Sequence, residues 1–499
     1  MSQGIYLELL KLAVPEVILV LTVLAVLAAD ALALRGMALR PRLLVTALMS
    51  SVGCVAAIAC LLVWPQEASY LDGTFVVSPL TQLVQVALLA LTILTLFLSV
   101  DAEFTPHVGE YAALILLSTV GMMFLVSSQN LLVIFLSLEL TSLSLYVLTA
   151  FDKRSAKSAE AALKYFLFGG MAAAITLFGL SLLYGLSGQI NLVHIAEKLS
   201  GPKLDPLLAV AIVMTLTGFG FKVAAAPFHL WAPDAYQAAP APSAAFIASG
   251  SKVAGFFVLA QVMVIGFKGI EGSGAWHNYQ PGWVPVMAIL AAVSMILGNL
   301  AAIVQSSVRR LLAYSAIAHA GYMLLGVMPH TGQSLVALVY YVVTYGLATL
   351  GAFGVVAIVE GRGGGDSLSD FAGLSRRAPV PAFCLLIFVL SLAGIPPLAG
   401  FFGKFYVFAA ALSGTAGASG LLWLVILALA MSAVSLYYYL LVLKQVYVAE
   451  PVAEATPLRP SLLLQALLVL VALAVVILGC APNLLLGPLS IAVGLAGGS

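Results

Sequence analysis

Apolar segments of about 20 residues recur along the whole chain, and this repetition constrains the fold more than any other feature. Of the 499 residues, 63% are hydrophobic and 8% are charged, whereas soluble domains carry about 25% charged residues. In lipid, every backbone polar group must be satisfied within the protein, and the sequence shows no alternating pattern of barrel strands. We therefore predict an all-α polytopic membrane protein.

The apolar segments predict fourteen transmembrane helices. Their approximate ranges in the sequence are 12–34, 43–64, 79–100, 111–128, 131–150, 161–186, 206–230, 242–267, 284–304, 310–328, 333–358, 382–409, 420–446 and 462–482.

The basic residues of the loops predict the orientation. Loops after odd-numbered helices hold thirteen lysines and arginines, and loops after even-numbered helices hold three. Because basic loops stay on the cytoplasmic side, we predict a multi-pass protein of the cell (inner) membrane with both termini on the periplasmic side. The two groups are Arg35, Arg40, Arg42, Lys153, Arg154, Lys157, Arg309, Arg310, Arg362, Arg376, Arg377, Lys444 and Arg459, against Lys198, Lys203 and Lys268.

The sequence lacks the motifs of the common cofactor sites. Its six histidines and four cysteines are scattered, without a CxxC or a Cys/His cluster, so zinc, iron–sulfur and haem-c sites are not expected. A P-loop and a GxGxxG turn are also missing, which gives no support for ATP or NAD binding. A net charge of +1 does not suggest a nucleic-acid partner. We expect no cofactor and no metal in this chain.

One segment, residues 218–255, combines two lysines with a proline density that no unbroken helix tolerates. Lys222 and Lys252 both lie in apolar surroundings. An intramembrane lysine beside a broken helix typically marks a pathway for substrate or ions. The alternative is a lysine that extends from a helix end to the lipid headgroups. The prolines between the two lysines are Pro227, Pro233, Pro240 and Pro242.

A second segment, residues 391–408, repeats this combination. Pro396 and Pro397 precede Lys404, in predicted helix 12. Interrupted helices at corresponding positions indicate inverted repeats, and repeats of five helices must be inverted because five is odd. We therefore predict that helices 4–8 and 9–13 are the repeats, with helices 7 and 12 broken. The expected units are 1–105 (helices 1–3), 106–270 (first repeat), 271–450 (second repeat) and 451–499 (helix 14).

Acidic residues at membrane depth are few. Glu139 is the clearest, because its flanks in helix 5 are apolar for more than two turns on each side. Glu16 and Asp30 lie nearer the ends of helix 1, where we expect them at the interface. Glu160 and Lys164 are four residues apart and share one face near the start of helix 6. That pair could also be an ordinary surface ion pair.

These residues permit proton transfer through the membrane. A lysine in an apolar interior gives up its proton more readily than in water, and a nearby carboxylate reverses the effect. Glu139, Lys222, Lys252 and Lys404 follow one another along the predicted helices. Broken helices admit waters, which carry protons between side chains. His229 and His319 either bridge gaps in such a relay or make plain structural hydrogen bonds.

Five motifs, in order between about residues 110 and 445, give the chain a specific resemblance. It resembles the antiporter-like membrane subunits of respiratory complex I, the proton-translocating NADH–quinone oxidoreductase, and among them the subunit N or chain 2 type. The resemblance implies a Glu–Lys pair at Glu139 and Lys222, a central relay lysine at Lys252, a terminal proton-transfer residue at Lys404 and a connecting role for Lys164. The motifs are SLELTSLSLYVL around Glu139, SAEAALKYFLFG around Lys164, GFKVAAAPFHLWAPDAYQAAPAP around Lys222, SVRRLLAYSAIAHAGYM around His319 and SLAGIPPLAGFFGKFYVF around Lys404.

The related subunit types fit less well. Subunit L carries a long lateral helix after its last spans, and subunit M typically has a glutamate at the position of Lys404. An Mrp-type sodium/proton antiporter subunit shares the ancestral motifs and is the alternative. A purely structural membrane scaffold is a third reading, but it leaves the four intramembrane lysines unexplained.

The resemblance also implies the chemistry and the partners. The chain would be a non-redox, proton-translocating subunit of a translocase, with Glu160, Lys164, His229 and His319 supporting the relay. NAD(H), FMN, iron–sulfur clusters and quinone would bind elsewhere in the complex. The partners would be other membrane-arm and peripheral subunits, including neighbouring antiporter-like subunits, and the lipid bilayer. The electron donor, NADH or ferredoxin for example, is left open.

Overall fold

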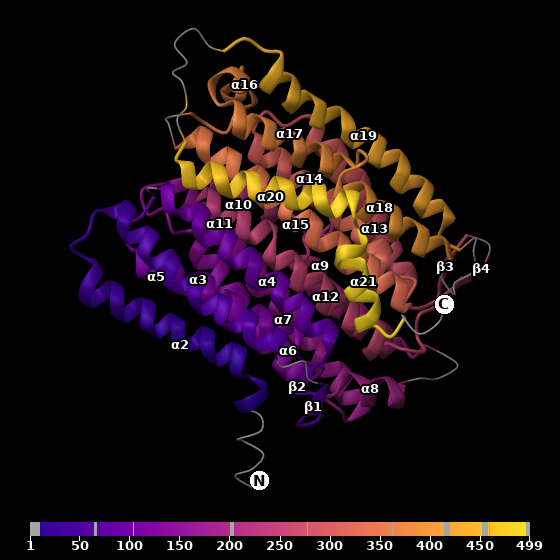
Figure 1. Cartoon of the computed structure of the whole chain (residues 1–499). Helices are drawn as coiled ribbons and strands as arrows, with labels where there is room; N and C mark the ends of the chain where they lie inside the picture. Colours follow the sequence, from indigo (N-terminus) through magenta and orange to yellow (C-terminus); the bar gives the residue numbers. More distant parts are fainter. Residues whose placement is uncertain are drawn as a thin grey trace.

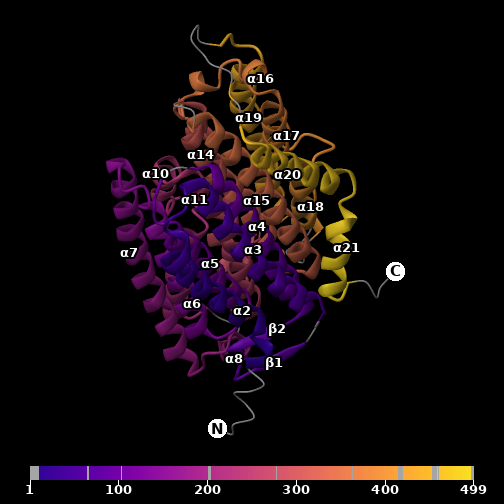
Figure 2. The ribbon, with the colours of Figure 1, turned by 60° about the vertical axis from the view of Figure 1, so that its left-hand side comes forward.

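The chain folds into a bundle of long helices whose axes run in broadly the same direction (Figure 1). Figure 2 shows the same bundle turned by 60°. In the part of the chain that the structure describes, the strands form only two short antiparallel hairpins, so the predicted all-α class is confirmed. The computed structural model describes residues 10–63, 67–102, 104–199, 204–276, 278–361, 364–413, 420–451, 458 and 460–495.

The N-terminal part contains three long helices and a hairpin. Helix α4 begins where Ser78 accepts a hydrogen bond from the backbone N–H of Thr81 and Pro79 occupies the first position, a combination that favours helix initiation. Helices α2 and α3 pack against each other and against α5. The elements are α2 (Val14–Ala29), η1 (Asp30–Leu34), α3 (Leu39–Val63), β1 (Ala68–Tyr70), β2 (Phe75–Val77), α4 (Pro79–Leu98) and η2 (Ser99–Asp101).

The middle part begins with regular helices and ends with short ones. Asn130, Ser155 and Asp205 cap α6, α7 and α9 by accepting hydrogen bonds from backbone N–H groups of the first turn, which satisfies donors that have no partner within the helix. The elements are α5 (Val108–Val126), α6 (Leu131–Thr149), α7 (Ala156–Ser187), α8 (Leu192–Leu199), α9 (Pro206–Lys222), α10 (Trp231–Ala238), α11 (Ala241–Ala248), α12 (Gly250–Gln261) and η3 (Val262–Gly266).

The C-terminal part is again helical, with one interruption between two apolar helices. Helix α17 ends at Gly394, whose φ of +88° is left-handed, a conformation that favours glycine. The elements are β3 (Ser273–Ala275), β4 (Asn278–Gln280), α13 (Trp283–Ile303), α14 (Val308–Val327), α15 (Gly332–Glu360), η4 (Leu368–Phe371), α16 (Leu374–Arg377), α17 (Pro379–Ala393), α18 (Ala399–Ser413), α19 (Leu422–Tyr447), α20 (Leu462–Cys480) and α21 (Asn483–Ala492).

The centre of the bundle is formed by α15 and by the α11–α12 segment. In the most apolar stretch of α15, 89% of the residues are buried, and in that of the α11–α12 segment 94% are buried. The corresponding fractions are 22% for α2 and 33% for α7 and α19. The outer helices therefore present apolar side chains outward, as a lipid-facing surface requires. The short elements β1–β2 and α8 lie towards one end of the bundle, and α10 and α16 lie towards the other (Figure 1).

Eleven helices in the described residues are long and apolar enough to cross a membrane. They coincide with predicted helices 1–6, 8, 9, 11, 13 and 14. The predicted helix 7 is represented by α9, which has 17 residues, and helix 12 is divided between α17 and α18. Predicted helix 10 corresponds to α14, which begins with Arg309 and Arg310. The count of fourteen, the repeats and their limits stay predictions.

Several features were not expected from the sequence. The hairpins β1–β2 and β3–β4 and the helices α8 and α21 all lie in segments that we predicted as loops or tails. The orientation also stays a prediction, because the terminal segments 1–9 and 496–499 lie outside the described residues, as do Lys203, Arg362 and Arg459.

Candidate functional site

Lys222 is the last residue of α9, and its side chain is buried. The helix ends there because Pro227 follows without an N–H to continue the backbone pattern, and Ala224 has a left-handed φ of +53°. The ammonium Nζ of Lys222 donates a hydrogen bond to Oγ of Ser142 on α6, at 3.1 Å. Ser142 lies one turn after Glu139, which interacts electrostatically with Lys222. The ion pairs among the described residues do not include these two charges, so Ser142 is the direct partner of the lysine.

Lys252 lies in α12 and is also buried. Its Nζ donates a hydrogen bond to the backbone carbonyl of Val223. This carbonyl has no partner within α9, because the helix ends one residue earlier. The end of α9 therefore connects Lys222 and Lys252, one through its side chain and the other through a carbonyl at the break.

Lys404, in α18, repeats this arrangement at the second break. Its side chain is buried, and Nζ donates to the carbonyl of Ala393, the last residue of α17, at 2.9 Å. Nζ also donates to Oγ of Ser432 on α19, at 2.9 Å, and lies 5.2 Å from the ring centre of Tyr322. Both breaks thus provide a free carbonyl to a buried lysine from another helix.

His319 lies in α14 and is buried. It interacts electrostatically with both Lys252 and Lys404. Its Nδ1 is 2.8 Å from the hydroxyl of Tyr341, and its Nε2 is 3.3 Å from the hydroxyl of Tyr439. Because each ring nitrogen faces a hydroxyl, which can donate or accept, the imidazole can exchange its donor and acceptor roles without losing a partner.

His229 lies in the connection between α9 and α10. It is buried, and its Nδ1 has no hydrogen-bond partner among the described residues. The structure does not place it in contact with the three lysines.

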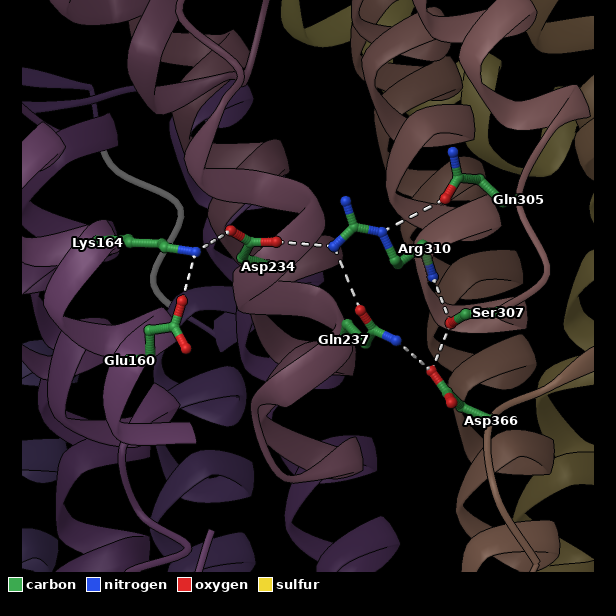
Figure 3. A network of polar contacts seen from close by, with 8 residues as sticks. All are labelled: Glu160, Lys164, Asp234, Gln237, Gln305, Ser307, Arg310 and Asp366. Carbon is green, nitrogen blue, oxygen red and sulfur yellow. Dashed lines mark hydrogen bonds and ion pairs between the residues drawn. The ribbon is translucent and has the colours of Figure 1, made fainter. Parts of the chain in front are cut away.

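Glu160 and Lys164 belong to a polar network that also includes Asp234 and Arg310 (Figure 3). Nζ of Lys164 is 2.7 Å from Oε1 of Glu160 and 2.9 Å from Oδ2 of Asp234 on α10. Oδ1 of Asp234 in turn is 2.7 Å from Nη1 of Arg310 on α14. The Lys164 side chain is 42% exposed, in contrast to the three buried lysines. Glu160, Lys164 and Asp234 are among the residues that line a cavity of about 510 Å³.

Sequence reasoning did not identify Asp234 and Arg310 as members of a site. Arg310 appeared there as a loop charge, and Asp234 was one letter in the motif around Lys222. The available signal was an acidic residue in WAPDAY, between two prolines and within an apolar region. Its partners are 70 and 76 residues away in the chain, so the sequence could not show which charges it meets.

Glu16 and Asp30, which we expected at the membrane interface, are both buried within the protein, and their depth in the membrane stays a prediction. Arg42 donates to both oxygens of Asp30 at 2.5 and 2.6 Å. Oε1 of Glu16 accepts a hydrogen bond from Nε2 of Gln85 at 2.7 Å, and Oε2 has no partner among the described residues. The packing of α2 against α3 and α5 removes both carboxyls from the surface, and among the described residues only Asp30 has a cationic partner.

Known proteins resemble this chain in sequence and fold. A family model described as the transmembrane region of NADH:quinone oxidoreductase and the Mrp antiporter matches residues 128–435. NADH-quinone oxidoreductase subunit N 2 from Acidobacterium capsulatum is 56% identical over 490 residues, which cover 96% of this chain and 98% of that protein.

Solved structures give the same relationship. A chain of respiratory complex I from Thermus thermophilus with bound aureothin has a TM-score of 0.78 and 36% identity, and the match covers 95% of this chain and 98% of that one. A chain of the Mrp complex from Dietzia has a TM-score of 0.79 over 97% of both chains, but at 21% identity it shows the fold alone. The chain therefore belongs to the family of antiporter-like membrane subunits of NADH-quinone oxidoreductase, of the subunit N type.

Proposed function

We propose that this chain translocates protons in the membrane arm of a complex I-type NADH:quinone oxidoreductase, driven by quinone reduction elsewhere in the complex. The observation that carries the proposal is the chemistry around Lys222, Lys252 and Lys404. Each ammonium is buried and donates to hydroxyl or carbonyl oxygens. Because these partners are neutral, an ammonium can lose its proton without leaving a directly paired carboxylate uncompensated.

The proposed relay runs from Glu139 through Lys222 and Lys252 to Lys404. The break after α9 connects the first two lysines, as described above. His319 is the proposed carrier between Lys252 and Lys404, since it interacts with both and imidazole can accept and donate a proton. Glu160, Lys164 and His229 are proposed as supporting residues outside this buried line.

The surface around Glu139 supports a neighbouring membrane subunit as partner. Glu139 is near the middle of α6 and partly exposed. On the same face, Leu136 and Leu143 are 65% and 51% exposed. A carboxylate at this depth is costly against lipid. We propose that another membrane-arm subunit covers this face of α6 and supplies polar contacts to Glu139.

The remaining proposals follow from the same relationship. Helices 7 and 12 of a fourteen-helix chain would be the broken elements α9 and α17–α18, in inverted repeats 106–270 and 271–450, flanked by 1–105 and 451–499. The chain would carry no redox centre, with NAD(H), FMN, iron–sulfur clusters and quinone bound by other subunits. The membrane would be the cell (inner) membrane, with both termini periplasmic. An Mrp-type antiporter is a distant alternative, because the Mrp chain is only 21% identical.

Substitution of the relay lysines in the assembled complex tests the proposal. Proteoliposomes with a pH-sensitive dye report protons pumped per quinone reduced. We expect Lys222→Ala, Lys252→Met and Lys404→Ala each to lower this ratio while the subunit composition stays complete. Lys444→Ala, which removes an exposed lysine in the last turn of α19, is the matched control. Normal pumping by all three assembled variants would contradict the relay.

A further inference from the structure

The short helix α10 lies between α7, from the first proposed repeat, and α14, from the second. It packs against α7 on one side and α14 on the other, and it follows the break at the end of α9. Asp234, near its middle, directs one carboxylate oxygen towards Lys164 of α7 and the other towards Arg310 of α14 (Figure 3). One carboxylate therefore joins three helices.

Both cations have other partners, so the network can rearrange without stranding a charge. Lys164 also pairs with Glu160 on its own helix. Nη1 of Arg310 donates to Oε1 of Gln237 at 3.2 Å, and Nε donates to Oε1 of Gln305 at 3.3 Å. Asp234 and Arg310 are each 29% exposed, and ion pairs with such exposure contribute little to folding stability. The main effect of these ion pairs is therefore to hold α10 in place, and their contribution to folding stability is small.

The first residue of α10 contacts the end of α9, where Lys222 lies. Nε1 of Trp231, the first residue of α10, donates to the backbone carbonyl of Phe221 at 3.0 Å. The Trp231 ring also stacks on Tyr165 of α7, with centroids 4.0 Å apart and planes 2° apart. Tyr165 follows Lys164 directly in the sequence. A shift of α10 therefore acts on the peptide unit that joins Phe221 to Lys222.

We propose that Asp234 is a positioning residue for proton transfer: it fixes α10 between α7 and α14, and α10 fixes Lys222 through the Trp231–Phe221 hydrogen bond. The charged groups that face Asp234 are Lys164 and Glu160 from α7 and Arg310 from α14. If Lys164 paired with Glu160 alone, Asp234 would lose its contact with α7, and α10 would no longer be held on that side. The proposal rests on the proposed proton-translocating function and adds two residues to it that do not carry protons themselves.

Variants of Asp234 and Trp231 in the assembled complex test this path. Asp234→Asn keeps the shape and removes the charge, and Trp231→Phe keeps an aromatic ring and removes the N–H donor. We expect each to lose about half or more of the pumping that Lys222→Ala loses, and Asp234→Glu to restore it. Because both act through one path, the double variant should lose no more than the more severe single variant. Glu110→Gln, which changes an exposed carboxylate 3.5 Å from Nδ1 of His107, should pump normally.

The outcomes separate this inference from the proposed function. Normal pumping by all three lysine variants, Lys222→Ala, Lys252→Met and Lys404→Ala, would overturn the proposed function. Loss in Lys222→Ala with normal pumping in Asp234→Asn and Trp231→Phe would overturn only the positioning role. Additive losses in the double variant, or no rescue by Asp234→Glu, would also overturn it. If Asp234→Asn fails to assemble, Trp231→Phe decides, because it leaves the ionic network intact.

Discussion

Substitutions of Lys404 distinguish most clearly whether a buried lysine carries protons or acts as a fixed positive charge. Lys404→Met removes the donor to the Ala393 carbonyl and the Ser432 hydroxyl. A buried carbonyl left without a partner costs about 1–3 kcal/mol. Folded domains are stable by about 5–15 kcal/mol, so the variant should still fold and assemble. We expect a lower melting temperature, a full set of subunits and a reduced number of protons pumped per quinone reduced.

Lys404→Arg restores the hydrogen-bond donors but not the proton transfer. A guanidinium can donate to both oxygens, yet it stays protonated through every cycle. The larger side chain costs about 1–3 kcal/mol in a packed interior, which again leaves the complex assembled. Pumping in proteoliposomes, followed with a pH-sensitive dye during quinone reduction, should therefore stay as low as in Lys404→Met. Pumping close to wild type with arginine would show that Lys404 acts as a fixed charge, and the relay would be wrong at this end.

Three further changes test neighbouring parts of the structure. Glu139→Gln should impair pumping far more than assembly, because the amide keeps the shape and loses the charge that acts on Lys222; normal pumping by the assembled variant would remove Glu139 from the mechanism. Arg42→Ala should lower the stability of the complex in thermal unfolding by about 3–5 kcal/mol, since it leaves the buried Asp30 unpaired, while Arg42→Leu with Asp30→Leu should cost much less. Gly394→Ala should lower both stability, by about 1–2 kcal/mol, and pumping, because the new methyl group would lie 3.3 Å from Nζ of Lys404. Gly188→Ala, at a φ of +66° with no atom within 4 Å, is the matched control and should affect stability alone.

The sequence predicted the membrane-spanning helices well, because the cost of placing polar groups in lipid forces long apolar segments at these positions. Eleven long apolar helices coincide with predicted ones. The exceptions have physical reasons: α9 is shortened by the break after Lys222, and α14 begins with two arginines. Hydropathy does not report on short polar connections, and α8 and the hairpins were therefore missed.

The site was predicted in its residues but not in its contacts. Composition showed that a lysine inside the membrane is costly, and the prolines showed where helices break. It did not show that the carbonyl of Val223 would be the partner of Lys252, or that Ser142 rather than Glu139 would be the direct partner of Lys222. These pairs are 29 and 80 residues apart. Burial of Glu16 and Asp30 was missed in part for the same reason, because Gln85 and Gly109, which contact them, are 69 and 79 residues away in the chain.

The coincidence of helix breaks and buried lysines has a physical explanation in the free carbonyls. A carbonyl at a helix end inside a membrane must find a donor, since lipid offers none. An ammonium has three N–H donors, and after losing one proton the neutral amine still has two. Lys252 can therefore satisfy the carbonyl of Val223, and Lys404 that of Ala393, in both protonation states. A carboxylate has no proton to donate to a carbonyl, and an arginine does not release its proton. Lysine is thus an ionisable side chain that can stabilise a broken helix throughout a proton-transfer cycle, which gives a physical reason why the breaks after α9 and α17 are matched to Lys252 and Lys404.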